Sequence, residues 1–245
     1  MGTVFNSKVF KGVSVAGKIV KGMAKNGLVF WKVQVPTDYI LAYDFNGNTA
    51  DASVNELNGV MTGDVAFEVG RKAGTQSLKF TNGCVKTILP IPINSDKVTI
   101  AFWMKTAKTT VAIVAEMSSN NNSNNAFMAA LNNVSNSGKL GVYERVSSNY
   151  NNAEISNANN NTWKHIVAVI DRSKNATDGI LIYVNGTLSP ITKESTFDNN
   201  GNFVNNILFI GQRNASSLPF VGNLQDFKVY NRVLSKDEIT ALYNE

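Results

Sequence analysis

The chain has 245 residues, of which 43% are apolar and 17% are charged, and it carries a net charge of +5. This composition excludes a disordered chain and allows one large domain with a proper core. A single cysteine excludes an intrachain disulfide, no apolar run is long enough for a membrane-spanning helix, and no signal-peptide pattern opens the chain.

The first segment, residues 1–36, predicts a basic β arm. Glycines at positions 12, 17, 22 and 27 separate short β-branched runs, and Asn26-Gly27 is a hairpin signal. Residues 1–35 hold six lysines and no acid, which leaves 17 bases against 18 acids in the rest of the chain. We expect this arm to anchor or oligomerise the protein through the residues Lys11, Lys21, Val29, Phe30 and Trp31.

Two other interpretations of the arm stay open. It could add ordinary strands to the following domain, or it could bind nucleic acid. Nucleic acid is the less favoured partner because the arm has lysines without the interleaved arginines and exposed aromatics of a base-binding surface, and the rest of the chain is almost neutral.

The second segment, residues 37–245, predicts an all-β domain. Its strand candidates alternate with clusters of Gly and Asn, and many short strands with such turns indicate an antiparallel β-sandwich. The predicted strands are 38–45, 78–87, 97–105, 110–117, 126–131, 139–146, 163–171, 179–184, 207–211 and 219–230.

Runs of asparagine are interpreted as loops, at 118–125, 149–152, 157–161 and 199–206. Amide side chains beside aromatic rings can bind sugar hydroxyls and the C–H faces of sugars. The candidate ligand-binding residues are Tyr143, Arg145, Tyr150 and Phe203. Tyr143 and Arg145 alternate with Val142, so we expect them to point outward.

No catalytic constellation is visible. His165 is the one histidine and lies in an apolar strand, which favours a structural role. Cys84 is expected to be a buried, inert thiol, because no group that would activate it is close in sequence. The acids Glu116, Glu144 and Glu154 are isolated from one another, so we expect no enzyme.

The chain ends in a strand and one capped helix. Alternation in the last strand puts Leu224, Asp226, Lys228 and Tyr230 on one face, and Phe227 and Val229 on the other. Ser235 precedes Glu238 by three residues, which is a capping box for a helix over 235–244.

Four blocks of sequence, in order, resemble the laminin-G-like, concanavalin-A-like jelly rolls. The blocks are Tyr43 to Asn48, Val98 to Lys105, Thr162 to Val169 with Ile182 to Gly186 and Phe209 to Gly211, and the strand and helix from Phe220 onward. The resemblance covers residues 38–245 and implies a concanavalin-A-like jelly roll with a short C-terminal helix. Members of this family are mostly ligand-binding modules.

The resemblance also implies two expectations about sites. Many relatives hold one structural Ca²⁺, and the matching positions here are Asp226, Asp44, Asn46 and Asp51. Gln225 stands where the family often has a second acid, which weakens this match. Glucanases of the same fold need two carboxylates at a fixed separation, and their Glu-x-Asp-x-Glu pattern is absent here.

The arm's composition resembles the N-terminal attachment segments of bacteriophage virion proteins. The predicted function is therefore a non-enzymatic virion protein of a phage head or tail, a fibre or decoration, made in the host cytoplasm. Its arm would bind other virion proteins and form a homo-oligomer, and its jelly roll would bind a cell-surface glycan, without membrane contact. The alternative is a carbohydrate-binding module of a bacterial surface or secreted protein.

Overall fold

The computed structural model describes residues 13–15, 18–25, 28–32, 34–117, 126–131, 138–146, 149–174, 178–195 and 201–245. The chain divides into two compact units, residues 1–37 with 235–245, and residues 38–234. Among the described residues, no helix has the length and apolar character needed to cross a membrane.

The first unit contains a three-stranded antiparallel sheet formed by β1 (Val13–Val15), β2 (Lys18–Lys25) and β3 (Leu28–Lys32). Lys25 pairs with Leu28, and residues 26 and 27, where the sequence predicts the hairpin turn, lie outside the described residues. Lys11 also lies outside them. Lys21, Val29, Phe30 and Trp31 lie in β2 and β3, of which only the backbone is described.

The helix α1 (Lys236–Tyr243) begins as the sequence predicts. The Ser235 side chain accepts a hydrogen bond from the Glu238 backbone N–H, and the Glu238 carboxylate accepts one from the backbone N–H of Ser235. Both bonds satisfy donors that a helix start leaves without partners, so the capping box fixes where α1 begins.

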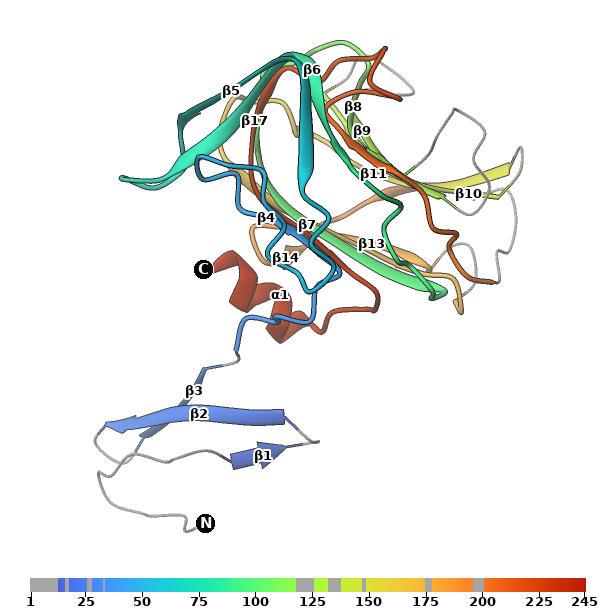
Figure 1. Cartoon of the computed structure of the whole chain (residues 1–245). Coiled ribbons are helices and arrows are strands. Elements are labelled where there is room, and N and C mark those ends of the chain that lie inside the picture. Colours follow the sequence, from blue (N-terminus) through green and yellow to red (C-terminus); the bar gives the residue numbers. More distant parts are fainter. Residues whose placement is uncertain are drawn as a thin grey trace. The chain divides into compact units, whose positions relative to one another are not determined.

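The second unit is one antiparallel sheet that curls into two layers (Figure 1). Its strand order is β14-β13-β12-β7-β17-β6-β16-β8-β9-β10-β11-β15, with β4 also paired to β17 and β5 to β6. The bounds are β4 Leu41–Tyr43, β5 Gly59–Val69, β6 Gln76–Thr87, β7 Lys97–Lys105, β8 Ala112–Met117, β9 Ala126–Leu131, β10 Leu140–Val146, β11 Asn149–Ile155, β12 Lys164–Asp171, β13 Ile180–Val184, β14 Thr187–Leu188, β15 Thr192–Ser195, β16 Leu208–Ile210 and β17 Gly222–Tyr230.

Alternation along the strands builds the core between the layers. In β7, Ile100 and Phe102 belong to the main core, whereas Trp103 and Lys105 lie on the opposite face. The same core contains Leu131 of β9 in the other layer, so the two halves of the sheet pack face to face. The all-β sandwich with one C-terminal helix that the sequence predicts is confirmed.

Two predicted local features are wrong. Asn149–Asn152 is not a loop but the start of β11, where Asn151 donates a 2.8 Å hydrogen bond to Glu144. In β17 the strict alternation breaks at a bulge between Gln225 and Lys228, with Asp226 at a φ of 51°. The extra residue moves Leu224 into the core beside Phe227 and Val229, so it does not share a face with Lys228.

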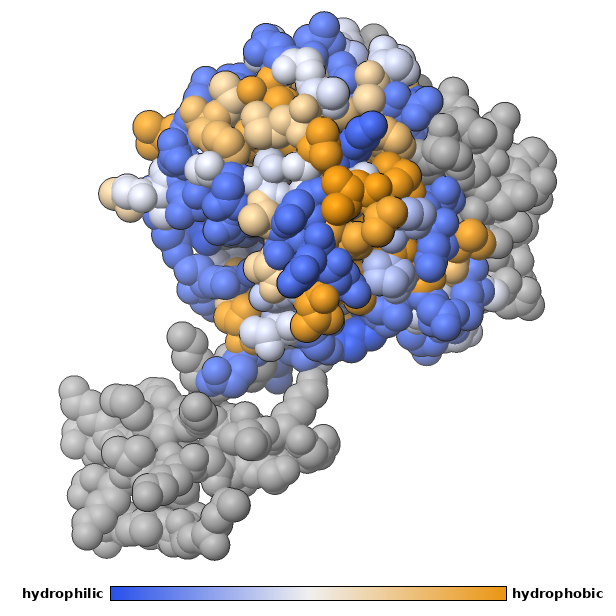
Figure 2. Space-filling view, in the orientation of Figure 1, coloured by the Kyte–Doolittle hydropathy of each residue, from blue (hydrophilic) through white to orange (hydrophobic). Residues whose placement is uncertain are grey.

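The face of the molecule seen in Figure 2 is mainly polar, with apolar side chains gathered in patches between the polar ones. The exposed large apolar residues are Val54, Val60, Met61, Val69, Ile88, Leu89, Leu188 and Val204. Of these, Val69 at the end of β5 borders the cleft described below.

An ion pair is buried at one end of the core. Arg172 donates through Nε to Glu144 Oε2 at 2.9 Å, and the two side chains are 0% and 4% exposed. The Arg172 guanidinium lies 3.6 Å from the centre of the Phe203 ring. Removing one partner leaves the other charge buried without compensation, which costs more than the pair itself contributes.

We therefore expect Arg172→Met to lower the free energy of unfolding by about 3–5 kcal/mol, as for other broken buried pairs. The double variant Arg172→Met with Glu144→Leu should recover a large part of this loss, because both charges are gone. Urea unfolding of the single and double variants measures the difference. A double variant as unstable as the single one would contradict the account.

Candidate functional site

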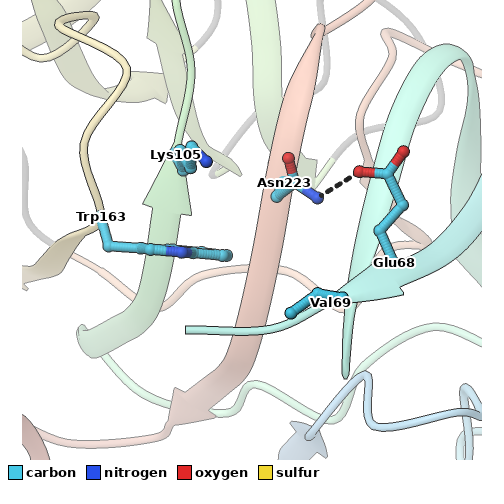
Figure 3. Close-up of a pocket in the computed structure, with 5 residues that line it drawn as sticks. All are labelled: Glu68, Val69, Lys105, Trp163 and Asn223. Carbon is cyan, nitrogen blue, oxygen red and sulfur yellow. Dashed lines mark hydrogen bonds between the residues drawn. The ribbon is translucent and has the colours of Figure 1, made fainter. Parts of the chain in front are cut away.

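A cleft of about 430 Å³ lies on the outer face of the layer that contains β7 and β17 (Figure 3). Five residues line it, namely Glu68, Val69, Lys105, Trp163 and Asn223. They come from β5, β7, β17 and the residue just before β12, so the cleft is made by strands that are distant in the sequence.

Strand register brings these side chains into line. Asn223 of β17 pairs with Lys105 of β7 on one side and with Lys79 of β6 on the other. Lys164 pairs with Met104, so the same register, continued by one residue, sets Trp163 opposite Lys105. Trp163, Lys105, Asn223 and Lys79 thus form a cross-strand row on one face, spaced at about 4.8 Å per strand.

The polar groups of the cleft are partly held by hydrogen bonds. The buried Asn223 donates from Nδ2 to Ser77 Oγ at 3.1 Å and to Glu68 Oε2 at 3.3 Å, the bond drawn in Figure 3. Lys79 Nζ lies 3.7 Å from the same Glu68 oxygen. One end of the cleft is therefore an ordered polar wall, while the half-buried Trp163 supplies an aromatic surface at the other.

A second row lies beside the first and stiffens the sheet under the cleft. Trp103 is stacked between His165, at 5.1 Å between ring centres, and the Arg71 guanidinium, at 4.3 Å. Arg71 also pairs with Asp226 at 3.1 Å and donates its backbone N–H to Gln225 Oε1 at 3.0 Å. The stack fixes the loop after β5, and with it Val69, against β17.

His165 is held neutral in this stack. Burial, with smaller contributions from the charges of Lys228 and Arg71, lowers its pKa from 6.5 to about 3. Its side chain is buried, and its backbone N–H donates to Asn185 Oδ1 at 2.9 Å. A histidine this hard to protonate packs as a neutral ring.

The ligand-binding residues predicted from the sequence do not gather in this cleft. Tyr143 is 2% exposed and donates a 3.1 Å hydrogen bond to Glu154, so the expectation that it points into solvent is wrong. It does lie opposite the main core, in a small cluster with Met128 and Ile113. Phe203 is 2% exposed and belongs to the main core.

Arg145 and Tyr150 are half-buried and face each other across β10 and β11. The ring of Tyr150 lies 6.2 Å from that of Tyr143. A role for these two residues in ligand binding stays a prediction.

The four positions predicted for calcium are engaged in other contacts. The Asp51 carboxylate accepts hydrogen bonds from the backbone N–H groups of Ala42, Ser53 and Leu57 and from the Ser53 hydroxyl. Asp226 pairs with Arg71, as described above. The Asp44 side chain accepts a hydrogen bond from the backbone N–H of Asn46, and the Asn46 side chain accepts one from the backbone N–H of Gln76.

No group of three acid, histidine or cysteine side chains that could hold a metal forms anywhere in the described part of the chain. The Asp51 oxygens already accept four hydrogen bonds, and Asp226 already faces a cation, so these side chains fit a calcium site poorly. Calcium binding stays an untested prediction.

The separation of the acids Glu116 and Glu154 bears on whether they could act together as the two carboxylates of a glycosidase. Glu116 of β8 pairs with Arg213 at 3.2 Å, and burial raises the pKa of its carboxyl group. Glu154 lies on β11, three strands away, where it contacts Lys139 and Tyr143. Three strand spacings are roughly 14 Å, which exceeds the separation of about 6.5–9.5 Å that an inverting glycosidase needs.

Sequence reasoning missed Trp163, Lys105, Asn223, Glu68 and Val69 as site residues. A signal for Trp163 is present: it follows the asparagine run 157–161 and has the same alternation as His165, on the face away from the core. The other four could not be found, because only the strand register aligns them with Trp163.

Comparison with known families identifies the superfamily to which the chain belongs. Residues 73–240 match the family Laminin_G_3, described as the concanavalin A-like lectin/glucanases superfamily. This match spans more than half of the chain, and the chain therefore belongs to that superfamily. The search of curated proteins found no significant match.

Solved structures share the fold at low sequence identity. Domain 4 of AbnA, a GH43 extracellular arabinanase from Geobacillus stearothermophilus in complex with arabinotriose, superposes with a TM-score of 0.63 at 15% identity, over 84% of this chain and 98% of that domain. The binding domain of botulinum neurotoxin serotype G superposes with a TM-score of 0.61 at 19% identity, over 84% of this chain. The chain spans about half the length of that toxin domain, since 50% of it is covered.

The His165 environment predicts how stability depends on pH. In the unfolded chain His165 takes up a proton near pH 6.5, whereas the folded protein resists it down to about pH 3. The stability that this group contributes is full above pH 6.5 and is lost as the pH falls toward 3. Between pH 7.5 and pH 5 this loss is about 2 kcal/mol.

His165→Phe should remove that share of the pH dependence, because a phenylalanine ring has no proton to gain. The free energy of unfolding of both proteins, measured in urea at pH 7.5, 6 and 5, checks this expectation. Parallel curves for the two proteins would show that His165 does not cause the loss.

Proposed function

We propose that this chain is a non-catalytic glycan-binding jelly roll whose ligand lies in the cleft beside Trp163. The observation that carries the proposal is the cross-strand row in which an aromatic ring, an ammonium group and an amide share one accessible face. None of these side chains belongs to the main core, so core packing does not explain why they are present there.

The chemistry of the cleft suits a sugar. A pyranose or furanose ring presents C–H groups on its face, which pack on an indole, and hydroxyls at its edge, which need directional partners. Trp163 and Val69 supply the apolar contacts, and Asn223 and Lys105 supply the polar ones. The row from Trp163 to Asn223 crosses two strand spacings, roughly 10 Å, which is enough for two linked sugar rings.

Two comparisons support the proposal without deciding it. The superfamily includes lectins, and one structure with the same fold is an arabinanase domain in complex with arabinotriose. A hydrolytic role is less well supported, because Glu68 is the one carboxylate among the residues that line the cleft and hydrolysis by two carboxylates needs a partner.

Trp163→Ala should abolish measurable binding to any glycan that the wild-type protein selects from a panel of neutral and acidic oligosaccharides, because it removes the surface on which the ring packs. Trp163→Phe should keep part of the affinity. Isothermal titration of the selected glycan measures both variants.

Tyr150→Ala is the matched control, since it removes a half-buried ring from the set predicted by sequence on another part of the domain. If Tyr150→Ala abolished binding and Trp163→Ala did not, the ligand site would lie at β10 and β11 and not in the cleft.

We further propose that the jelly roll is displayed on a phage virion for host attachment, with the basic arm bound to other virion proteins in a homo-oligomer. The arm's own three-stranded sheet and its six lysines without an acid support this role. An isolated three-stranded sheet of this size buries little apolar surface, so it gains stability from a partner.

Deletion of residues 1–36 tests the arm. We expect the full chain to be an oligomer and the chain beginning at Thr37 to be a folded monomer, by light scattering and circular dichroism. A full chain that is already monomeric would remove self-assembly. Unfolding on truncation would show that the arm completes the domain and does not serve as an assembly device.

A further inference from the structure

Two charged residues line the cleft, Glu68 and Lys105, and within the described residues Lys105 has the fewer ion pairs and side-chain hydrogen bonds. Its side chain is half-buried at the centre of the row, and no ion pair or side-chain hydrogen bond of Lys105 is found within the part of the chain that the structure describes. By contrast, Glu68 already contacts both Asn223 and Lys79. The open electrostatic position in the cleft is therefore that of an anion.

The surroundings strengthen this field. Lys228 is a further cation on this face of the sheet, and its charge acts to lower the pKa of His165, whereas Arg71 is paired with an acid. Two acids face the same region. Asp226 is paired with Arg71, and Glu68 is paired with Lys79.

The partners of Glu68 decide between attraction by Lys105 and repulsion by Glu68. The Glu68 carboxylate accepts a hydrogen bond from Asn223 at 3.3 Å and lies 3.7 Å from the Lys79 ammonium, so a cation already faces its charge. An anionic group in contact with the Lys105 ammonium would be separated from it by about 3 Å. The attraction at Lys105 therefore outweighs the repulsion from Glu68.

We propose that the cleft binds an acidic glycan, with a sugar ring on Trp163 and a carboxylate or sulfate of the sugar on Lys105. This inference rests on the proposed glycan-binding function and adds the charge of its ligand. Register places Lys105 directly beside Trp163, so the acid belongs to the stacked sugar or to the one linked to it.

The test uses pairs of probes that differ only in charge. Trigalacturonic acid is compared with its methyl ester, and a sulfated galactan oligosaccharide with its desulfated form, each titrated into the full chain. We expect the charged member of at least one pair to bind about tenfold more tightly than its neutral form, as for a charge-assisted contact. This difference should shrink in high NaCl, and the pair that shows it identifies carboxylate or sulfate.

Lys105→Gln should remove the preference for the charged member, so that the charged and the neutral form bind the variant with equal affinity. Lys86→Gln is the matched control, because Lys86 is an exposed lysine of β6 outside the cleft, and it should keep the preference. A preference that survives Lys105→Gln, or that Lys86→Gln removes equally, overturns the assignment to Lys105.

The two proposals fail in different ways. Equal binding of charged and neutral forms, lost in Trp163→Ala, overturns the acidic-glycan inference and leaves the glycan-binding site standing. Failure of both charged probes to bind, when the wild-type protein binds neutral glycans of the panel, also overturns only the inference. Absence of binding to every glycan, charged or neutral, overturns both.

Discussion

The bulge at Asp226 is the constraint on which the arrangement of this domain depends. β17 pairs with β4, β6 and β7, so its register determines how these strands meet. One extra residue in the strand lets Leu224 and Phe227 both enter the core, while Asn223 and Gln225 face the opposite side. Asp226 itself adopts a positive φ, a conformation that aspartate tolerates better than most residues, and its carboxylate binds Arg71. The same bulge therefore completes the core on one face and anchors the Arg71–Trp103–His165 stack on the other.

Much of the fold follows from the sequence because buried strands are short apolar runs bounded by turn residues. Residues 97–105 contain such a run, buried at all seven positions from 98 to 104, and the predicted strand coincides with β7. Prediction of strands from the sequence fails where a strand is exposed or where its composition is typical of a loop. β5 is largely exposed and is held by its pairing with β6, so its sequence carries little alternation. β11 opens with asparagines that look like a loop, yet Asn151 and Asn152 are buried, and Asn151 bonds to Glu144. In both cases tertiary pairing overrides local propensity.

The cleft could not be predicted for a different physical reason. Its residues are ordinary when taken one at a time: a tryptophan before a strand, a lysine at a strand end and an asparagine near the bulge. They become a site only when β12, β7 and β17 are placed side by side in one register, which depends on residues 60 to 131 positions apart in the sequence. The sequence-based choice of Tyr143 and Phe203 was misled by their aromatic character, which serves packing in both cases. Tyr143 bonds to Glu154, and Phe203 carries the Arg172 guanidinium on its face.

The two faces of β7 explain why a shared fold carries so little information about ligands. Inward residues such as Phe102 are constrained by a core to which both layers contribute, and changing them costs several kcal/mol. Lys105 and Trp163 contribute nothing to that core, so the fold can accept other residues at their positions at small cost. Structures at 15–19% identity can therefore keep the jelly roll while their outer faces diverge. In this chain the cleft on the outer face combines the accessible indole of Trp163 with the Lys105 ammonium, and this combination, not the fold, is the argument for an acidic sugar.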